Sequence, residues 1–251
     1  LISNNYKSNI FVSNIYYSNI LSILFLKKLN IKIVLIERTP YQELSIYYNF
    51  SDFIKKNIIK FLIGITFKKA DCCVSNSKYI SKKFNQRYNL NFKTIYPPSF
   101  DNRVYSKKTF ILNSKFIHVG TACRLTKEKG LENFIKIIPK LKKNIIFKVI
   151  GDGPELNNLQ NISKNLGIKN RVKFLGKQKP NKIKSIIKKF DLYINCSDFE
   201  GFPNSVVEAI SVGVPVVASQ SHGGINEILN NKKFGLIYKN EAELIYILNS
   251  I

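Results

Sequence analysis

Glu200 and Glu208 are the first residues of this sequence whose type and spacing suggest chemistry. They follow the apolar run 192–195 and have Gly201 between them. We expect a strand, a tight turn and then a helix, and the amides at the start of a helix attract anions. Both carboxylates can accept hydrogen bonds from hydroxyl groups. The pattern therefore predicts an anion-binding helix start flanked by two acceptors for hydroxyls.

Each glutamate also has a purely structural interpretation. Ser205 and Glu208 have the spacing of a capping box, in which the glutamate closes the start of its own helix. Glu200 is also compatible with a solvated charge on a loop, which is the commoner case for a loop glutamate. The sequence leaves both alternatives open.

The second candidate group consists of two cations, which are placed where they could bind phosphate. Arg124 and Lys129 follow the apolar run 116–119 and precede the amphipathic stretch 131–141. Arginine presents a planar fork that matches paired phosphate oxygens, and lysine adds a point charge at the helix start, so a diphosphate is the expected ligand. Because lysines abound and arginines are scarce here, Lys129 is also compatible with a solvated charge, whereas Arg124 is the stronger candidate.

Two further glycine-bearing loops follow predicted strands. Gly151 comes directly after the run 145–150, where its small size lets backbone approach a ligand. The third glycine of a dinucleotide fingerprint is missing there, so a nicotinamide or flavin enzyme is not supported. The pair Gly223 and Gly224 precedes Glu227 after another predicted strand. All four loops are expected at the same edge of one sheet.

The elements that must position these loops alternate between strands and helices. Such alternation predicts parallel sheets covered on both faces, with ligands beyond the carboxyl ends of the strands. Polar residues at 101–114 predict a linker, which gives domains at 1–107 and 108–251. The predicted strands are 10–13, 31–36, 71–75, 116–119, 145–150, 172–175, 192–195 and 215–218, and the predicted helices are 17–29, 53–69, 131–141, 154–166, 181–190 and 205–212.

The amino-acid composition restricts the classes of ligand that this chain is expected to bind. The 251 residues carry 40 Lys+Arg against 16 Asp+Glu, a formal charge of +24 that favours phosphate-bearing ligands. The basic residues are dispersed and form no nucleic-acid motif, so nucleic-acid binding is disfavoured.

The four cysteines form no Cys-x-x-Cys pair, and neither zinc nor disulfides are expected. Without a bilayer-length apolar stretch or a signal peptide, we expect a cytoplasmic protein, and without any methionine we expect a fragment.

In combination these motifs resemble a known family, the retaining glycosyltransferases of family 4 with the GT-B fold. The resemblance rests on the Glu-x7-Glu pair Glu200 and Glu208, on the run 213–218, on Gly223-Gly224 with Glu227, and on Arg124 with Lys129. It covers residues 116 to 238, and 37–40 and 70–77 match more loosely. It implies two Rossmann-like domains facing a cleft: a partial acceptor-side domain at 1–107 and a domain at 108–251 that binds a nucleotide-sugar. A family member carries more chain at both ends.

The resemblance also implies roles for individual residues. Arg124 and Lys129 would bind the diphosphate of the donor, and Glu200 would contact the hydroxyls of the transferred sugar. Glu208 would hold the ribose. The remaining donor contacts would come from Gly151, Gln178 near the base, Gly201, Phe202, Pro203 and Asn204. The family needs no metal and no cofactor, the donor is expected to be of the UDP type, and the acceptor is expected to be lipid-linked or a surface polysaccharide.

Other functions remain to be weighed against transfer with retention. A sugar-nucleotide epimerase shares the fold but should show a different set of carboxylates and histidines. A truncated chain would bind nucleotide-sugar without turnover. The stretch 53–69 mixes apolar residues with lysines, which fits either peripheral contact with the inner face of an anionic membrane or a core-facing helix with solvated lysines.

Overall fold

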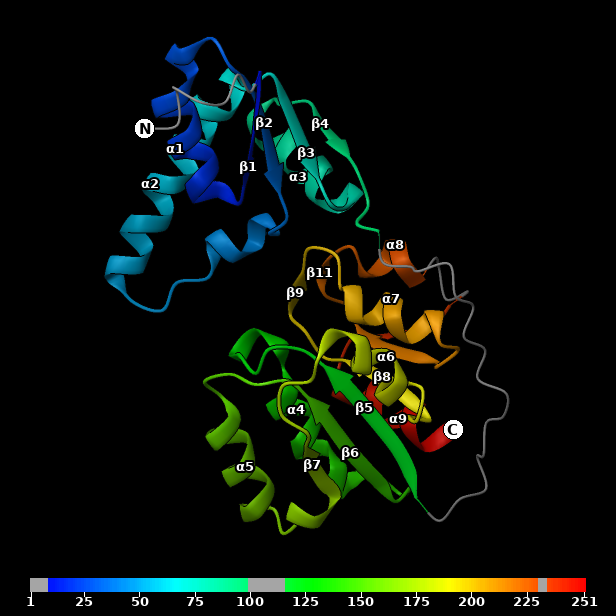
Figure 1. Ribbon diagram of the computed structural model, residues 1–251. Coiled ribbons are helices and arrows are strands. Elements are labelled where there is room, and N and C mark those ends of the chain that lie inside the picture. The colour runs from blue at the N-terminus through cyan, green and yellow to red at the C-terminus, as the bar shows by residue number, and fades with distance from the viewer. Residues whose placement is uncertain (1–8, 99–115, 230–233) are drawn as a thin grey trace. The chain divides into compact units, whose positions relative to one another are not determined.

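The computed structural model describes residues 9–98, 116–229 and 234–251, and they divide into two compact units (Figure 1). The first unit contains Leu1–Pro97 with the short segments Glu200–Phe202 and His222–Gly224, and the second contains the rest. The predicted linker 101–114 and the predicted boundary at 108 lie outside the described residues.

The first unit is built on a four-stranded sheet in the order β1-β2-β3-β4, with parallel neighbours throughout. Asn49 and Ser77 begin the second and third helices, because their side-chain oxygens accept the amide hydrogens of Asp52 and Ile80. A single buried cluster joins all three helices to the sheet. The elements are β1 (Ile10–Asn14), α1 (Tyr16–Leu26), β2 (Lys32–Glu37), α2 (Phe50–Thr66), β3 (Cys72–Ser75), α3 (Lys78–Tyr88) and β4 (Phe92–Thr94), with short 3-10 turns at Lys27–Leu29, Tyr41–Ser45 and Phe67–Lys69.

The second unit contains a six-stranded sheet with all its paired strands parallel. Its strand order is β12-β10-β8-β5-β6-β7. The main elements are β5 (Ile117–Ala122), α4 (Leu131–Ile137), β6 (Ile145–Ile150), α5 (Leu156–Asn165), β7 (Val172–Phe174), α6 (Pro180–Ile187), β8 (Leu192–Asn195), α7 (Asn204–Ser211), β10 (Val216–Ser219), α8 (Ile225–Leu229), β12 (Leu236–Tyr238) and α9 (Glu241–Ser250), with 3-10 turns at Lys127–Lys129, Ile138–Lys140 and Lys169–Arg171.

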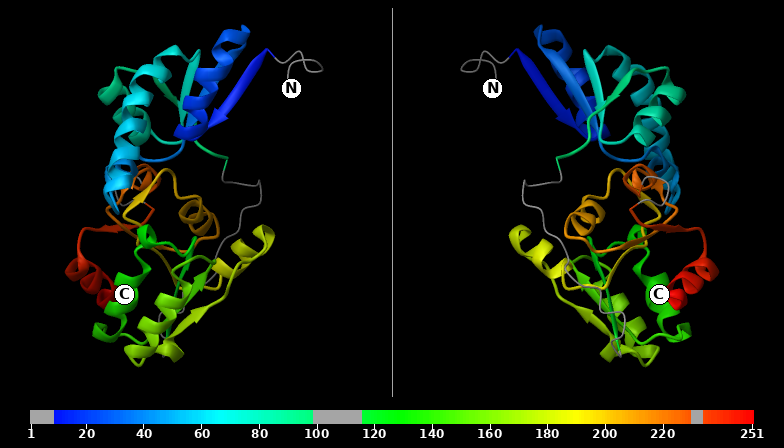
Figure 2. Two further views of the ribbon diagram at one scale, coloured as in Figure 1. Left: turned by 90° about the vertical axis from the view of Figure 1, so that its left-hand side faces the viewer. Right: turned by 90° about the vertical axis from the view of Figure 1, so that its right-hand side faces the viewer.

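Both faces of this second sheet are covered, as expected for a doubly wound fold (Figure 2). One buried cluster joins α4, α5 and α9 to one face, and another joins α6, α7 and α8 to the other. Numbered by their succession along the chain, the six strands follow the Rossmann order 3-2-1-4-5-6. In such a sheet the direction of winding reverses between β5 and β8, and ligands bind in the crevice that this reversal opens.

Most predicted elements are present within a few residues of their expected bounds. The predictions for β6 and β8 agree with the structure at both ends. The sequence did not predict α3, β4, α8, β12 or α9. It also missed a two-stranded pairing of β9 (Phe199–Glu200) with β11 (His222–Gly223), which places Glu200 beside the Gly223-Gly224 pair.

The carboxyl group of Glu37 is buried and forms no ion pair with any described residue of the chain. Glu37 ends β2 and is fully buried. Its Oε1 accepts the amide hydrogens of Arg38 and Thr39 at 3.0 and 3.1 Å, whereas its Oε2 has no hydrogen-bond partner among the described residues. Burial raises the pKa of Glu37 to about 8, since removing a carboxylate from water disfavours its charged form.

This shift predicts that the free energy of unfolding falls as pH rises between about 4.5 and 8. Over that range the folded chain keeps the proton of Glu37 and the unfolded chain has lost it, so unfolding releases a proton. The shift corresponds to a loss of up to about 5 kcal/mol. Urea unfolding of the wild type and of Glu37→Gln at several pH values measures this, and the variant should lose that part of the dependence. Identical pH profiles for the two proteins would contradict the assignment.

Candidate functional site

A pocket of about 630 Å³ lies at the carboxyl ends of β5 and β6, beside the point where the winding of the second sheet reverses. Its walls come from the loops after β5, β6 and β7, and from α6 and α7. The lining residues are Ala122, Cys123, Arg124, Ile150, Gly151, Asp152, Gly153, Lys177, Gln178, Ile183, Asn204, Ser205 and Glu208. All of them belong to the second unit, so this part of the site is complete within one body.

Backbone hydrogen bonds hold the loops of this pocket together. The amide of Cys123 donates to the carbonyl oxygen of Ile150 at 3.0 Å, and that of Leu125 donates to Asp152 at 2.9 Å. Gly151 has φ +133° and donates its amide to Gly176 at 2.9 Å. A Cβ atom at Gly151 would lie 1.8 Å from the carbonyl oxygen of Cys123, so only glycine fits there.

The cationic side of the pocket is suited to phosphate. Arg124 is exposed and lines the pocket together with the exposed Lys177. The first two residues of α7, Asn204 and Ser205, also line it, so the end of the helix that carries partial positive charge belongs to the same wall. An arginine fork and a helix start are two of the standard means by which proteins bind phosphate.

Glu208 supplies an acceptor on the same helix. It is half-buried, and burial raises its pKa above the ordinary value while Lys184 partly offsets the effect. The capping-box alternative is not observed, because α7 begins at Asn204 after Pro203, and Ser205 is already its second helical residue. Within the described part of the chain, no side chain caps this helix. The carboxylate of Glu208 is therefore placed on the pocket wall rather than at the start of its own helix.

Five of the ten site residues predicted from the sequence line this pocket. These are Arg124, Gly151, Gln178, Asn204 and Glu208. Lys129, Glu200, Gly201, Phe202 and Pro203 do not line it.

Lys129 nevertheless lies close to the chain that leads to Glu200. It ends the 3-10 turn Lys127–Lys129, and the amide of Asp198 donates to the carbonyl oxygen of Glu128 at 2.9 Å. The next residue, Gly130, packs so closely on the carbonyl oxygen of Cys196 that a Cβ atom would lie 2.2 Å from it. The turn that carries Lys129 is thus fixed against the segment that follows β8.

Glu200 and Gly201 are held by the loop that the sequence singled out for its two glycines. The amide of Gly224 donates to the carbonyl oxygens of Glu200 and Gly201 at 3.3 and 3.1 Å. Gly223 has φ +141°, and a Cβ atom there would lie 1.4 Å from the carbonyl oxygen of Glu200. The glycine pair therefore serves to let backbone pass directly beside Glu200.

Lys177 and Asp152 are lining residues that sequence reasoning did not single out. Asp152 lies between the two glycines of the loop after β6, and Lys177 directly precedes Gln178. Their position just after a predicted strand was the available signal. In a chain with so many lysines, that signal did not distinguish Lys177 from a solvated charge.

The second unit is thus a doubly wound domain whose pocket carries an arginine and a helix start, two groups that are suited to a phosphate-bearing ligand. Residues 105–246 match the family model described as glycosyl transferases group 1, and the chain belongs to this family. The family and the GT-B fold expected from the sequence are thereby confirmed, and the protein is of the glycosyltransferase class.

Among curated relatives, the chain is 28% identical over 198 residues to the N-acetyl-alpha-D-glucosaminyl L-malate synthase of Bacillus anthracis, covering 74% of this chain and 50% of that protein. It is 27% identical over 218 residues to a Campylobacter jejuni enzyme named as an N-acetylgalactosaminyltransferase acting on a diphospho-undecaprenol, covering 84% of this chain and 57% of that protein. The chain thus spans about half the length of these relatives.

Solved structures agree on the fold. The Anabaena protein Alr3699/HepE, in complex with UDP and glucose, superposes with a TM-score of 0.78 at 22% identity, covering 96% of this chain and 68% of that one. Sucrose-phosphate synthase from Thermosynechococcus elongatus superposes with a TM-score of 0.81 at 15% identity, covering 98% and 65%.

Proposed function

We propose that this chain binds a nucleoside-diphosphate sugar of the UDP type and takes part in transferring its sugar to a lipid-linked or polysaccharide acceptor. The observation that carries the proposal is the pocket at the reversal point of the second sheet, which combines Arg124, the start of α7 and Glu208. A cation fork, helix amides and a carboxylate are the groups that a diphosphate joined to a ribose requires.

In this proposal the diphosphate lies against Arg124 and the first turn of α7, with Lys129 as a further cation. Glu208 accepts hydrogen bonds from the ribose hydroxyls. Gln178 is proposed to lie near the base, where backbone groups would contact it. Its side chain donates to the carbonyl oxygen of Leu175 at 2.5 Å, which keeps this loop folded against the end of β7.

Glu200 is proposed to contact the hydroxyls of the transferred sugar, with Gly201, Phe202, Pro203 and Asn204 presenting backbone near the sugar and the phosphates. In transfer, the bond between the anomeric carbon and the phosphate oxygen breaks and the acceptor oxygen forms a new bond to that carbon. Negative charge develops on the departing diphosphate, and the proton of the acceptor hydroxyl passes to this diphosphate or to water. Fixed cations and helix amides stabilise this charge and lower the barrier.

Retention of configuration is proposed from family membership alone, and we assign no covalent role to Glu200. The acceptor class is proposed in the same way, since the name of the Campylobacter relative includes a lipid diphosphate. Peripheral contact with the inner face of the cytoplasmic membrane, where such an acceptor would lie, is part of this proposal. Among the described residues, no helix is both long enough and apolar enough to cross a bilayer.

The experiment that tests the function is a screen of UDP-sugars with this chain and with a complete family member as a positive control. Titration with UDP measures binding, and release of UDP from each UDP-sugar measures turnover. Binding with release of UDP supports an enzyme that cleaves the donor, and binding without any turnover at high protein concentration supports a module that only binds the donor. Interconversion of the sugar without release of UDP would support an epimerase instead, and absence of UDP binding would refute the proposal.

Glu208 gives a prediction that separates ribose binding from phosphate binding. Glu208→Ala should weaken UDP binding by about tenfold, because two ribose hydroxyls lose a charged acceptor. Binding of inorganic diphosphate, which has no ribose, should change less than about twofold. Isothermal titration calorimetry with both ligands measures the difference, and an equal loss for the two ligands would contradict the assigned role.

A further inference from the structure

The two strands on either side of the reversal point, β5 and β8, are paired over only part of their length. β5 pairs with β6 as far as Ala122, whereas its described pairing with β8 ends at Gly120. The two strands therefore part before the chain reaches Arg124 on one side and α7 on the other. The backbone groups of Ala122 on the side of β8 need another partner, because an unpaired buried amide or carbonyl group is costly.

The hydroxyl group of Tyr193, on β8, is that partner. It accepts the amide hydrogen of Ala122 at 3.0 Å and donates to the carbonyl oxygen of the same residue at 3.2 Å. Tyr193 is fully buried, and its ring belongs to the cluster that joins α6, α7 and α8 to the sheet. One side chain of β8 thus makes the hydrogen bonds that continued pairing of the two strands would otherwise make.

The same hydroxyl also connects β5 to α7. Burial raises the pKa of Tyr193, and hydrogen bonds with the side chains of Ser205 and Thr121 and with the amide of Ala122 partly offset this effect. Ser205 is the second residue of α7 and lines the pocket, as does Ala122. A single buried hydroxyl is therefore hydrogen-bonded both to the wall that carries Arg124 and to the wall where α7 begins.

We propose that Tyr193 is a positioning residue for the diphosphate site, an inference that rests on the proposed function. Arg124 follows Ala122 by two residues, and Ser205 belongs to the first turn of α7. A diphosphate that contacts both walls requires a fixed distance between them, because its hydrogen bonds form only over a narrow range of distance and angle. Tyr193 sets this distance without touching the ligand, since it is fully buried and does not line the pocket.

A buried tyrosine can also serve only to pack the core while its hydroxyl finds some hydrogen-bond partner. That alternative accounts for the ring of Tyr193, which packs in an apolar cluster. It does not account for the position of the hydroxyl, whose partners are one pocket-lining residue of β5 and one of α7. The choice of partners favours a role in the site.

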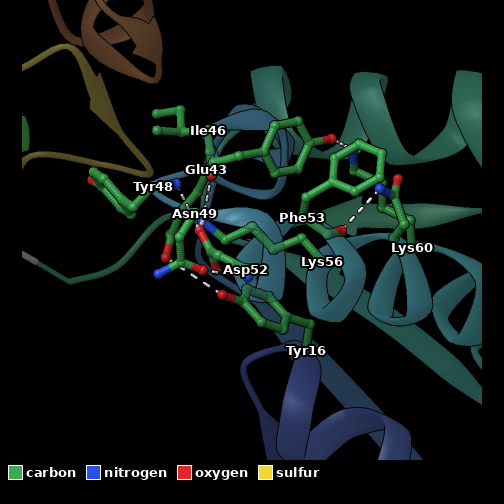
Figure 3. Close-up of polar contacts among 11 residues, drawn as sticks. Tyr16, Glu43, Ile46, Tyr48, Asn49, Asp52, Phe53, Lys56 and Lys60 are labelled. Carbon is green, nitrogen blue, oxygen red and sulfur yellow. Dashed lines mark hydrogen bonds and ion pairs between the residues drawn. The ribbon is translucent and has the colours of Figure 1, made fainter.

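The test is the substitution Tyr193→Phe, which keeps the ring and removes the hydroxyl. UDP and inorganic diphosphate should both bind about tenfold more weakly, since both need Arg124 and the start of α7 at their present spacing. Glu208→Ala, by contrast, is expected to weaken mainly the binding of UDP. The matched control is Tyr16→Phe, which should leave UDP binding unchanged. Tyr16 is also buried, but its hydroxyl donates to Oε1 of Glu43 at 3.4 Å in the first unit (Figure 3).

Two further measurements separate positioning from a general loss of stability. In the Arg124→Ala background, Tyr193→Phe should weaken UDP binding by no more than about threefold, because the guanidinium that the hydroxyl helps to place is already absent. Hydrogen exchange measured by NMR should show the amide of Ala122 exchanging at least about tenfold faster in Tyr193→Phe than in the wild type. Tyr16→Phe should leave that exchange rate unchanged.

Three results would overturn the proposal while leaving the proposed function intact. They are equal UDP affinities for the wild type and Tyr193→Phe, a full tenfold loss in the Arg124→Ala background, and an unchanged exchange rate of the Ala122 amide. A wild-type chain that binds neither UDP nor inorganic diphosphate would instead refute the proposed function, and this inference with it.

Discussion

Replacing Arg124 with alanine is expected to weaken UDP binding by about thirtyfold, which corresponds to about 2 kcal/mol. Arg124 lines the pocket together with the first residues of α7, and the other lining residues given above include no second arginine. Its guanidinium can make two parallel hydrogen bonds to phosphate oxygens that no lysine of the pocket can reproduce. Because the side chain is exposed, its removal should leave the fold intact.

The same substitution should reduce transfer further than it reduces binding, where turnover is measurable. Charge on the departing diphosphate grows in the transition state, and removing one fixed donor there costs on the order of 3 kcal/mol. The control is Arg87→Ala, since Arg87 is also an exposed arginine and lies on α3 in the first unit. Equal UDP affinities for the wild type and Arg124→Ala would contradict the assignment of the diphosphate to this wall.

Gly151→Ala is expected to disrupt the pocket itself and to lower the free energy of unfolding by at least about 3 kcal/mol. The φ of Gly151 is +133°, which side chains rarely adopt, and the added Cβ atom would lie 1.8 Å from the carbonyl oxygen of Cys123. The loops after β5 and β6 would have to separate, and their hydrogen bonds would be lost. UDP binding should then be abolished together with the loss of stability.

Gly167→Ala provides the control for this prediction. Gly167 also has a positive φ, +67°, but no atom of the described residues lies within 4 Å of the point that an added Cβ atom would occupy. We expect a loss of only about 1 kcal/mol and unchanged UDP binding. Urea unfolding and UDP titration of both variants measure the difference. Equal losses of stability for the two variants would show that the contact with Cys123 does not constrain the loop.

Five of the six strands of the second sheet were predictable, because their sequences are short apolar runs bounded by glycine or polar residues. β6 reads Ile-Ile-Phe-Lys-Val-Ile and is followed by Gly151, and both of its ends were predicted correctly. α3 was missed because its sequence, Lys78–Tyr88, is mostly polar. Its place in the fold depends on a few buried side chains, Ile80 and Phe84 among them, that pack with Phe92 of β4. Such contacts between distant residues are not encoded in local periodicity.

For the site, the sequence could predict residues that directly follow strands, since these must meet at one edge of a parallel sheet. Arg124 and Gly151 were found in this way, and Glu208 was found from its spacing to Glu200 and its place on the helix after that loop; all three line one pocket. Glu208 could either cap its own helix or bind a ligand, and only the position at which α7 begins decides between these roles. A sequence defines that position only within a few residues.

The most direct test of the central claim is a crystal structure of this chain with UDP bound. We predict the diphosphate within hydrogen-bond distance of the guanidinium of Arg124 and the first amides of α7, with the ribose hydroxyls on the carboxylate of Glu208. UDP bound at any other place, or a pocket that stays empty at saturating UDP, would contradict the claim that this pocket holds the donor nucleotide.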